Sequence, residues 1–271
     1  MKKISSQDNK IYKTCIQLGS KKYRDKLGKY IIEGPNLVRE ALDNNVIPEI
    51  LIISQQVFEM EEIQILCRAY LQKVDKDGGN QVFIFEDKLF SKIIQTENSQ
   101  GILGIVEKFT NNENLFFNSK FRNSGNVLVL DRLQDPGNVG TVIRTADAAG
   151  YSGILIIKGT VDVFSPKVVR ACTGSLFRMP ILFVDSPNEA IQMLKDNGKR
   201  VVSTGFDTDK YYYEIDLTQN IGLVIGNEGN GICDEFKNNS DEIIKIPMFG
   251  NIESLNASVA AALLMYETMR K

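Results

Sequence analysis

Residues 127–150 decide the fold of the second half of the chain, and they read VLVLDRLQDPGNVGTVIRTADAAG. The first four residues, VLVL, predict a buried strand, and the small and apolar residues from Thr141 to Ala149 predict a helix that Gly150 ends. A strand that leads through a short loop into a helix is typical of parallel sheets, whose strands need crossover connections. This stretch therefore predicts an α/β fold.

The loop between that strand and its helix carries the first candidate functional residues. Pro136 and Gly137 favour a tight turn, and Asn138 is a good helix N-cap, so local architecture accounts for much of the loop. It does not account for Arg144, a long cation in a helix of small and apolar residues near the carboxyl end of the strand. A surface salt bridge is the alternative interpretation of Arg144.

Further apolar strands alternate with helical stretches from residue 126 onward. This spacing predicts a mainly parallel sheet with helices on both faces. Ligands of such sheets bind beyond the carboxyl ends of the strands, so the loops that follow Leu130, Ser203, Ile225 and Ile246 are the expected site. The predicted strands are Val127–Leu130, Ile154–Ile157, Ile181–Val184, Arg200–Ser203, Leu223–Ile225 and Ile243–Ile246.

A second loop, Gly226–Gly231, holds three glycines in six residues, which let the backbone approach a ligand or itself closely. The loop lacks the Gly-Lys-Ser/Thr ending of a phosphate loop and the Gly-x-Gly-x-x-Gly order of a dinucleotide site. A ligand read by backbone groups is therefore favoured over a phosphate cradle. Glu228 could orient a cation such as Arg144, or it could cap the helix expected near Ile232.

A third loop, Ile246–Glu253, leads into a helix rich in small residues. Ser254 is the expected N-cap, and the face from Ala257 to Ala262 predicts close packing against another element or a partner subunit. Asn256, in the first turn, is harder to assign to packing.

The first half of the chain predicts a smaller α/β domain. A strand and a Gly-Pro break at Tyr30–Pro35 precede a helix, and strands are expected at Glu49–Ile53, Val82–Phe85 and Ile102–Val106, with a helical stretch around Phe58–Leu71. A polar, Asn-rich segment follows. We therefore expect a domain at 1–109, a linker at 110–124 and a second domain at 125–271.

Composition excludes several classes of chemistry. The chain has no histidine, which removes Ser-His-Asp triads, Cys-His dyads and histidine general bases. Its four cysteines lie far apart, so we interpret them as packing residues and expect no metal site. No apolar stretch approaches eighteen residues and no secretory signal is evident, which favours a cytoplasmic protein without a membrane span.

Charge is unevenly distributed along the chain. The formal net charge is −2, yet residues 1–29 hold nine basic groups against two acids. Such a segment suits contact with a phosphate backbone, and a solvated basic face is the alternative.

The three loops together closely resemble the signature motifs of the SpoU (TrmH-like) RNA 2′-O-ribose methyltransferases, a family of the SPOUT or α/β-knot superfamily. The resemblance covers about residues 126–271. The first half is similar, more weakly, to the small RNA-binding domain found in many members. All polar signature positions of the family are present, as Asn138, Arg144, Glu228, Ser254 and Asn256.

The resemblance implies a cofactor, a topology and an assembly. The cofactor is S-adenosylmethionine, and the C-terminal domain is expected to contain a deep trefoil knot. A homodimer is implied, with the last helix in its interface. The residues implied in cofactor binding are Thr204, Gly205, Gly226, Ile246 and Leu255.

The resemblance also implies roles in the reaction. Arg144 would contact the ribose 2′-hydroxyl, and since a guanidinium stays protonated, we expect it to position the oxygen and stabilise developing alkoxide. Glu228 and Asn138 would fix Arg144, while a phosphate or water accepts the proton. The residues expected to bind RNA phosphate are Lys21, Lys22, Arg24 and Arg170, with a structural ion pair as the alternative for Arg170.

The sequence leaves alternatives to this function. A non-catalytic RNA-binding protein would keep the fold, but the intact polar signature disfavours it. A nucleotide-dependent oxidoreductase is disfavoured by the missing Gly-x-Gly-x-x-Gly. Among methyltransferase targets, 23S rRNA is expected ahead of tRNA, and resistance to a ribosome-targeting antibiotic is a conceivable outcome.

Overall fold

The computed structural model describes residues 1–74, 81–94, 99–109, 113–118 and 125–270. These residues form two compact units, of which unit 1 contains Met1–Phe109 and Asp162–Phe177 and unit 2 contains Thr110–Val161 and Arg178–Lys271. The sequence placed 162–177 in the second domain, but this segment packs with unit 1. Of the expected linker, 113–118 is a helix, α6 (Glu113–Asn118), and the remainder lies outside the described residues.

Unit 1 is built on a mixed five-stranded sheet with the order β1-β4-β3-β5-β2. Strands β1 and β3 run parallel to β4, whereas β5 is antiparallel to both β3 and β2. The strands are β1 (Lys2–Ile4), β2 (Lys29–Glu33), β3 (Ile50–Ser54), β4 (Val82–Phe85) and β5 (Ile102–Glu107).

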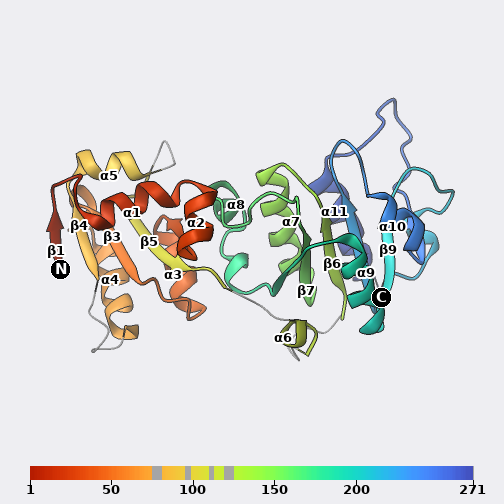
Figure 1. Cartoon of the computed structure of the whole chain (residues 1–271), viewed down its shortest axis with the longest axis horizontal. Helices are drawn as coiled ribbons and strands as arrows, with labels where there is room; N and C mark the ends of the chain where they lie inside the picture. The colour runs from red at the N-terminus through yellow and green to blue at the C-terminus, as the bar shows by residue number, and fades with distance from the viewer. Residues whose placement is uncertain (75–80, 95–98, 110–112, 119–124, 271) are drawn as a thin grey trace. The chain divides into compact units, whose positions relative to one another are not determined.

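Helices cover both faces of this sheet (Figure 1). Side chains of α1 and α5 join alternate strand residues in one apolar cluster, and α3 packs with α4 on the other face. The helices are α1 (Lys10–Leu18), α2 (Lys21–Leu27), α3 (Pro35–Asp43), α4 (Glu61–Lys73), α5 (Asp87–Ile93) and α8 (Pro166–Ala171), with short 3-10 turns η1 (Gln55–Val57) and η2 (Ser175–Phe177).

The later segment of unit 1, Asp162–Phe177, is held by a buried ion pair and an aromatic cluster. The Arg24 guanidinium donates to Asp162 at 2.8 and 2.9 Å. The Phe164 ring packs against Tyr30 and Phe109, each at a centroid distance of 5.0 Å. These contacts make 162–177 part of the core of unit 1.

Unit 2 contains a six-stranded sheet with the order β11-β9-β10-β6-β7-β8, and every neighbouring pair is parallel. This confirms the predicted parallel sheet. The direction of strand succession reverses between β6 and β10, and such a reversal leaves a crevice at the carboxyl ends. The strands are β6 (Val127–Asp131), β7 (Gly153–Ile157), β8 (Ile181–Val184), β9 (Arg200–Thr204), β10 (Ile221–Gly226) and β11 (Glu242–Ile244).

Helices cover both faces of the parallel sheet as well. One apolar cluster joins α6, α9 and α10 to the sheet, and α7 packs with α11 on the other face (Figure 1). The helices are α7 (Pro136–Ala148), α9 (Pro187–Asp196), α10 (Asp234–Asn239) and α11 (Ala257–Glu267), with the 3-10 turn η3 (Tyr212–Glu214). In the described ranges, no helix is both long and apolar enough to span a membrane.

Burial agrees with the interpretation of the cysteines as packing residues. Cys15, Cys67 and Cys172 are buried and Cys233 is half-buried, and all four are free thiols. Burial raises the pKa of Cys15 and of Cys172 to about 12. Thiols with so high a pKa remain protonated and unreactive at neutral pH.

Candidate active site

A chain of side-chain hydrogen bonds joins the three loops that the sequence singled out. Asn256 Nδ2 donates to Asn138 Oδ1 at 3.0 Å, and Asn138 Nδ2 donates to Glu228 Oε1 at 3.0 Å. These residues are separated by 118 and 90 positions in the chain. The structure therefore brings one polar residue from each loop into direct contact.

The first loop is shaped by a cap that the sequence assigned to a different residue. Asp135, rather than Asn138, is the N-cap of α7, and its Oδ1 accepts from the Asn138 backbone amide at 2.8 Å. Pro136 occupies the first turn, where a missing amide costs nothing. The Asn138 side chain, in a residue only 9% exposed, is thereby left for the contacts with Asn256 and Glu228.

Glu228 binds the backbone of this same loop. Its carboxylate accepts from the amide of Gln134 at 3.1 Å and from that of Asp135 at 3.2 Å, besides Asn138. Desolvation alone would raise the pKa of Glu228, but the hydrogen bonds from Asn138 and from nearby amides outweigh it and lower that pKa. Glu228 is therefore an anion that holds the first loop, instead of capping a helix near Ile232; α10 begins at Asp234.

The third loop ends in a second corrected cap. Asn256, not Ser254, is the N-cap of α11, and its Oδ1 accepts from the amides of Ser258 and Val259 at 3.0 and 3.4 Å. Since its Nδ2 reaches Asn138, the Asn256 amide group uses its oxygen to start α11 and its nitrogen to fix α7. Asn256 is therefore a capping residue that also bridges to α7, and not a packing residue.

Arg144 lies on the exposed face of α7. The hydrogen bonds described for Glu228 go to Asn138, Gln134 and Asp135, so the suggestion that Glu228 orients Arg144 gains no support from these contacts.

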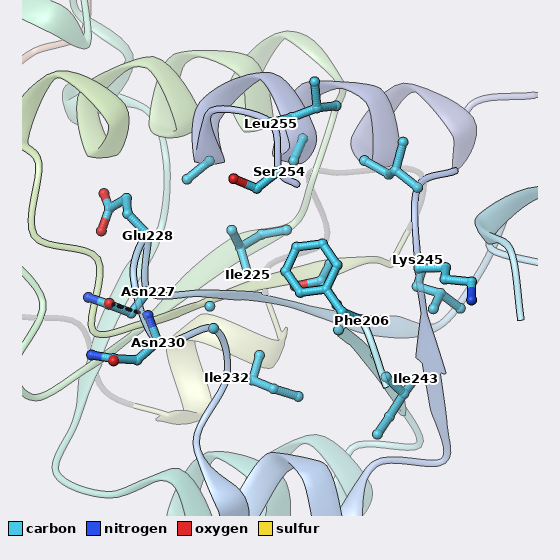
Figure 2. A pocket seen from close by; sticks show the side chains of 18 of the residues that line it. Phe206, Ile225, Asn227, Glu228, Asn230, Ile232, Ile243, Lys245, Ser254 and Leu255 are labelled. Atoms are coloured by element: carbon cyan, nitrogen blue, oxygen red, sulfur yellow. Dashed lines mark hydrogen bonds between the residues drawn. The ribbon is translucent and has the colours of Figure 1, made fainter. Parts of the chain in front are cut away.

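A pocket of about 780 Å³ opens where the loops after β9, β10 and β11 converge (Figure 2). Its volume lies within the range of small-molecule and cofactor sites. All five residues expected to bind the cofactor line it, and so do Glu228 and Ser254. The five are Thr204, Gly205, Gly226, Ile246 and Leu255.

At the second loop, the wall of the pocket is formed by two backbone segments that lie very close to each other. A Cβ at Gly226 would lie 2.3 Å from the carbonyl carbon of Gly231 and 2.4 Å from the nitrogen of Ile232. The loop closes through reciprocal backbone hydrogen bonds of 2.9 Å between Asn227 and Gly231. Only glycine fits at position 226, so the pocket presents backbone groups there.

The sequence did not identify the Asp131–Arg132 pair that supports these loops. Asp131 is fully buried, binds the Arg132 guanidinium, and accepts from the Cys233 amide at 2.7 Å. The Arg132 carbonyl accepts from Asn227 Nδ2 at 2.8 Å, which ties the first loop to the second. Arg132 has a φ of 60°, a left-handed conformation uncommon for a residue other than glycine. The sequence signal for this pair was Asp131 itself, an acid directly at the end of an apolar strand.

The basic residues of unit 1 separate into different roles. Lys21 pairs with Asp25 at 2.6 Å on the surface of α2, and Lys22 is exposed. Arg24 is only 4% exposed, and besides Asp162 it donates to the carbonyls of Leu18 and Gly19. This placement corrects the prediction that Arg24 contacts RNA phosphate, because its guanidinium is enclosed and already neutralised.

Arg170 is half-buried on α8 in unit 1, and its Nη1 has no hydrogen-bond partner in the described part of the chain. A buried donor without a partner costs free energy, so that cost must be offset elsewhere or the donor satisfied by a ligand.

No group of three His, Cys, Asp or Glu residues within the described ranges is placed to hold a metal ion.

Two regions of the chain match known protein families. Residues 125–266 match the SpoU rRNA Methylase family, and residues 9–104 match the MRM3-like substrate binding domain. The 23S rRNA (guanosine(2553)-2'-O)-methyltransferase RlmP of Bacillus subtilis (strain 168) is 34% identical over 271 residues, which cover 98% of each protein.

Two solved structures with bound AdoMet, that is S-adenosylmethionine, share the architecture. An rRNA methyltransferase from Sinorhizobium meliloti is 30% identical, with coverage of 98% of this chain and 96% of that chain and a TM-score of 0.85. The SpoU methyltransferase AviRb from Streptomyces viridochromogenes is 26% identical, with coverage of 96% and 97% and a TM-score of 0.84.

Fold and comparisons together define an S-adenosylmethionine-dependent RNA methyltransferase. The chain belongs to the SpoU rRNA methylase family. The predictions of family, enzyme class and cofactor are thereby confirmed, whereas the roles of individual site residues stay predictions.

Proposed function

We propose that this enzyme methylates a ribose 2′-hydroxyl of 23S rRNA, with the pocket of unit 2 as the cofactor site. The observation that carries the proposal is the full-length similarity to a 23S rRNA 2′-O-methyltransferase, which extends over both the substrate-binding and the methylase regions. A tRNA target is the alternative. An enzyme that acts on tRNA would need the methylase region but not the same first half of the chain.

The residues of the pocket fit S-adenosylmethionine. The loop at Gly226 offers backbone donors and acceptors suited to the adenine edge and ribose, and buried aliphatic side chains such as Ile225 and Leu264 offer an apolar surface. Thr204, Gly205, Gly226, Ile246 and Leu255 would hold the molecule. When bound, S-adenosylmethionine supplies a methyl group activated by its sulfonium.

Arg144 would act on the RNA side of the reaction. A ribose hydroxyl is a weak nucleophile, so it needs accurate placement and loss of its proton. A guanidinium is a cationic group that donates hydrogen bonds and accepts none, so Arg144 positions the 2′-oxygen and stabilises developing negative charge, while a phosphate oxygen or water accepts the proton.

The Asn256–Asn138–Glu228 hydrogen bonds would position this machinery without touching the reacting atoms. They fix the start of α7, which carries Arg144, against the start of α11. Ser254, two residues before the α11 cap, lines the pocket. The chain of hydrogen bonds thus couples the placement of Arg144 to that of the cofactor site.

RNA recognition in unit 1 would use Lys21, Lys22 and Arg170, but not Arg24. Lys22 is an exposed cation, and Arg170 is half-buried, so both keep accessible surface for a phosphate, although the Nη1 atom of Arg170 is itself buried. Lys21 would exchange its surface ion pair with Asp25 for a phosphate contact at little cost, because exposed ion pairs contribute about 0–1 kcal/mol.

The assembly and topology implied by the family complete the proposal. Apolar side chains of α11 at Val259, Leu263 and Tyr266 are 48%, 44% and 55% exposed, at spacings of four and three residues that place them on one side. We expect this stripe to form a homodimer interface. The trefoil knot of unit 2 and a cytoplasmic location belong to the same proposal.

The decisive experiment measures methyl transfer to 23S rRNA prepared from cells that lack this protein. Wild-type enzyme should create a 2′-O-methyl at one nucleotide, detected by mass spectrometry of RNA fragments. Arg144→Ala should lose more than nine-tenths of the rate, at least about 1.4 kcal/mol in barrier, while still binding S-adenosylmethionine. Arg200→Ala is the control, since Arg200 lies at the amino end of β9, away from the carboxyl ends of the strands.

Two results would contradict the proposal. Modification of tRNA with none of 23S rRNA would move the target to the alternative. Retention of more than a tenth of the rate by Arg144→Ala would remove this guanidinium from the mechanism.

A further inference from the structure

A large aromatic side chain lies in water at the cofactor pocket. Phe206 lines the pocket and is 65% exposed. In Figure 2 its ring stands in the middle of the lining side chains, with Leu255 above it and Ile232 and Ile243 below. Exposing a ring of this size forgoes the stabilisation that burial would provide, so the ring is available to a ligand.

The backbone around Phe206 is fixed on both sides. The Gly205 amide donates to the Ile244 carbonyl at 3.0 Å, and the Thr208 hydroxyl donates to the Ile243 carbonyl at 2.9 Å. The Thr208 amide also donates to the Phe206 carbonyl at 2.9 Å. Both anchors lie on β11, so the ring is presented from a braced turn.

The rest of the pocket supplies one face and one edge for a flat heterocycle. Ile225 and Ile232 are each 3% exposed and form apolar wall, and the Gly226 loop presents backbone groups. A second apolar face is needed to enclose such a ring. Phe206 can supply it, because it is an aromatic side chain that lines the pocket.

We propose that Phe206 stacks on the adenine of S-adenosylmethionine and gives this enzyme its preference for a purine cofactor. The inference rests on the proposed function in taking this pocket as the cofactor site. Phe206 thereby acts as a binding and specificity residue, separate from Arg144, which acts on RNA.

Local charge favours a neutral ring over RNA backbone as the partner of Phe206. The next residue, Asp207, is an exposed acid that lines the pocket. The two lysines of the lining lie near acids, Lys245 at 3.7 Å from Asp209 and Lys237 at 3.3 Å from Asp234. A phosphate would meet little uncompensated positive charge here, whereas adenine needs none.

The absence of tryptophan from the sequence allows a direct test. Phe206→Trp would place a unique fluorophore at the proposed stacking position, and S-adenosylhomocysteine, adenosine and methionine would be titrated into it without RNA. S-adenosylhomocysteine and adenosine should quench its fluorescence, and methionine should not. Phe249→Trp is the matched control, because Phe249 is 95% exposed and does not line the pocket.

Calorimetry with S-adenosylhomocysteine gives the second measurement. Phe206→Ala should weaken binding about tenfold, in line with the effect of removing one base-stacking aromatic, and Phe206→Tyr should bind like the wild type. Melting temperatures of both variants should match the wild type, since the ring is exposed.

The outcomes distinguish the stacking of Phe206 on adenine from the proposed function. If the wild type binds S-adenosylhomocysteine and Phe206→Ala binds it within twofold, the stacking inference is wrong and the proposed function stands. Quenching at position 206 that requires RNA, or that methionine produces equally, would also overturn the inference. Failure of the wild type to bind would remove both.

Discussion

Asn138 shows how much of this site depends on a single side-chain amide. Its oxygen accepts from Asn256 and its nitrogen donates to Glu228, so both ends of the group are used. The residue is nine-tenths buried, where an unpaired polar atom is costly. A substitution that keeps size but changes one end therefore disrupts the contact with one loop selectively.

The charge of Glu228 should make stability depend on pH. Its pKa is lower in the folded protein than in the unfolded chain, so its contribution is complete above the ordinary carboxyl pKa and is lost as pH falls through the folded value. At pH 7, Glu228→Gln should lower the free energy of unfolding by about 1 kcal/mol, a modest figure because the group is partly exposed. Urea denaturation should show this difference shrinking below about pH 4.

Asn138→Ala provides the control for this prediction. In that background Glu228 has lost a donor, so Glu228→Gln should cost less than it does in the wild type. Equal costs in both backgrounds, or a difference that does not change with pH, would show that the carboxylate is not held by this hydrogen bond.

Among the elements, the glycine-rich loop after β10 is the one that most strictly limits which residue type can occupy a position. Gly226→Ala would place a methyl group against backbone atoms of Gly231 and Ile232, which cannot move aside as the end of a flexible side chain could. We expect its melting temperature to fall by roughly 10 °C and its affinity for S-adenosylhomocysteine to be lost.

Gly229→Ala tests the same loop where there is room. Its added Cβ would meet only Asn227 Oδ1, at an ordinary distance of 3.7 Å. The melting temperature and calorimetric affinity of this variant should remain near those of the wild type. Comparable damage from both substitutions would mean that loop flexibility, and not the close approach at Gly226, limits the site.

Sequence alone predicted the elements better than their junctions. Apolar runs located the strands of the parallel sheet, and the three loops expected at its carboxyl ends are joined by side-chain hydrogen bonds. The caps were wrong, because Asn138 and Ser254 are as suitable locally as Asp135 and Asn256, and only tertiary contacts distinguish them. The burial of Arg24 was equally hidden, since its partner Asp162 lies 138 residues away.

At the scale of the whole molecule, the exposed apolar stripe of α11 predicts the oligomeric state. Light scattering of the wild type should give about twice the chain mass of 30.4 kDa. Leu263→Glu should give monomers, because it places a charge in the expected interface.

Ile65→Glu is the matched control, since Ile65 is a similarly exposed aliphatic residue on α4 of unit 1. That variant should remain dimeric. A monomeric wild type, or a Leu263→Glu variant that stays dimeric, would exclude α11 as the interface.

The hydrogen bond between Asn256 and Asn138 also has a consequence for folding of the enzyme during translation. Helix α7 emerges more than a hundred residues before the Asn256 amide that binds it, so a nascent polypeptide that has not yet reached Asn256 holds an incomplete site. Methylation competence should thus appear abruptly, late in synthesis, and ribosomal RNA would be protected from modification by half-made copies.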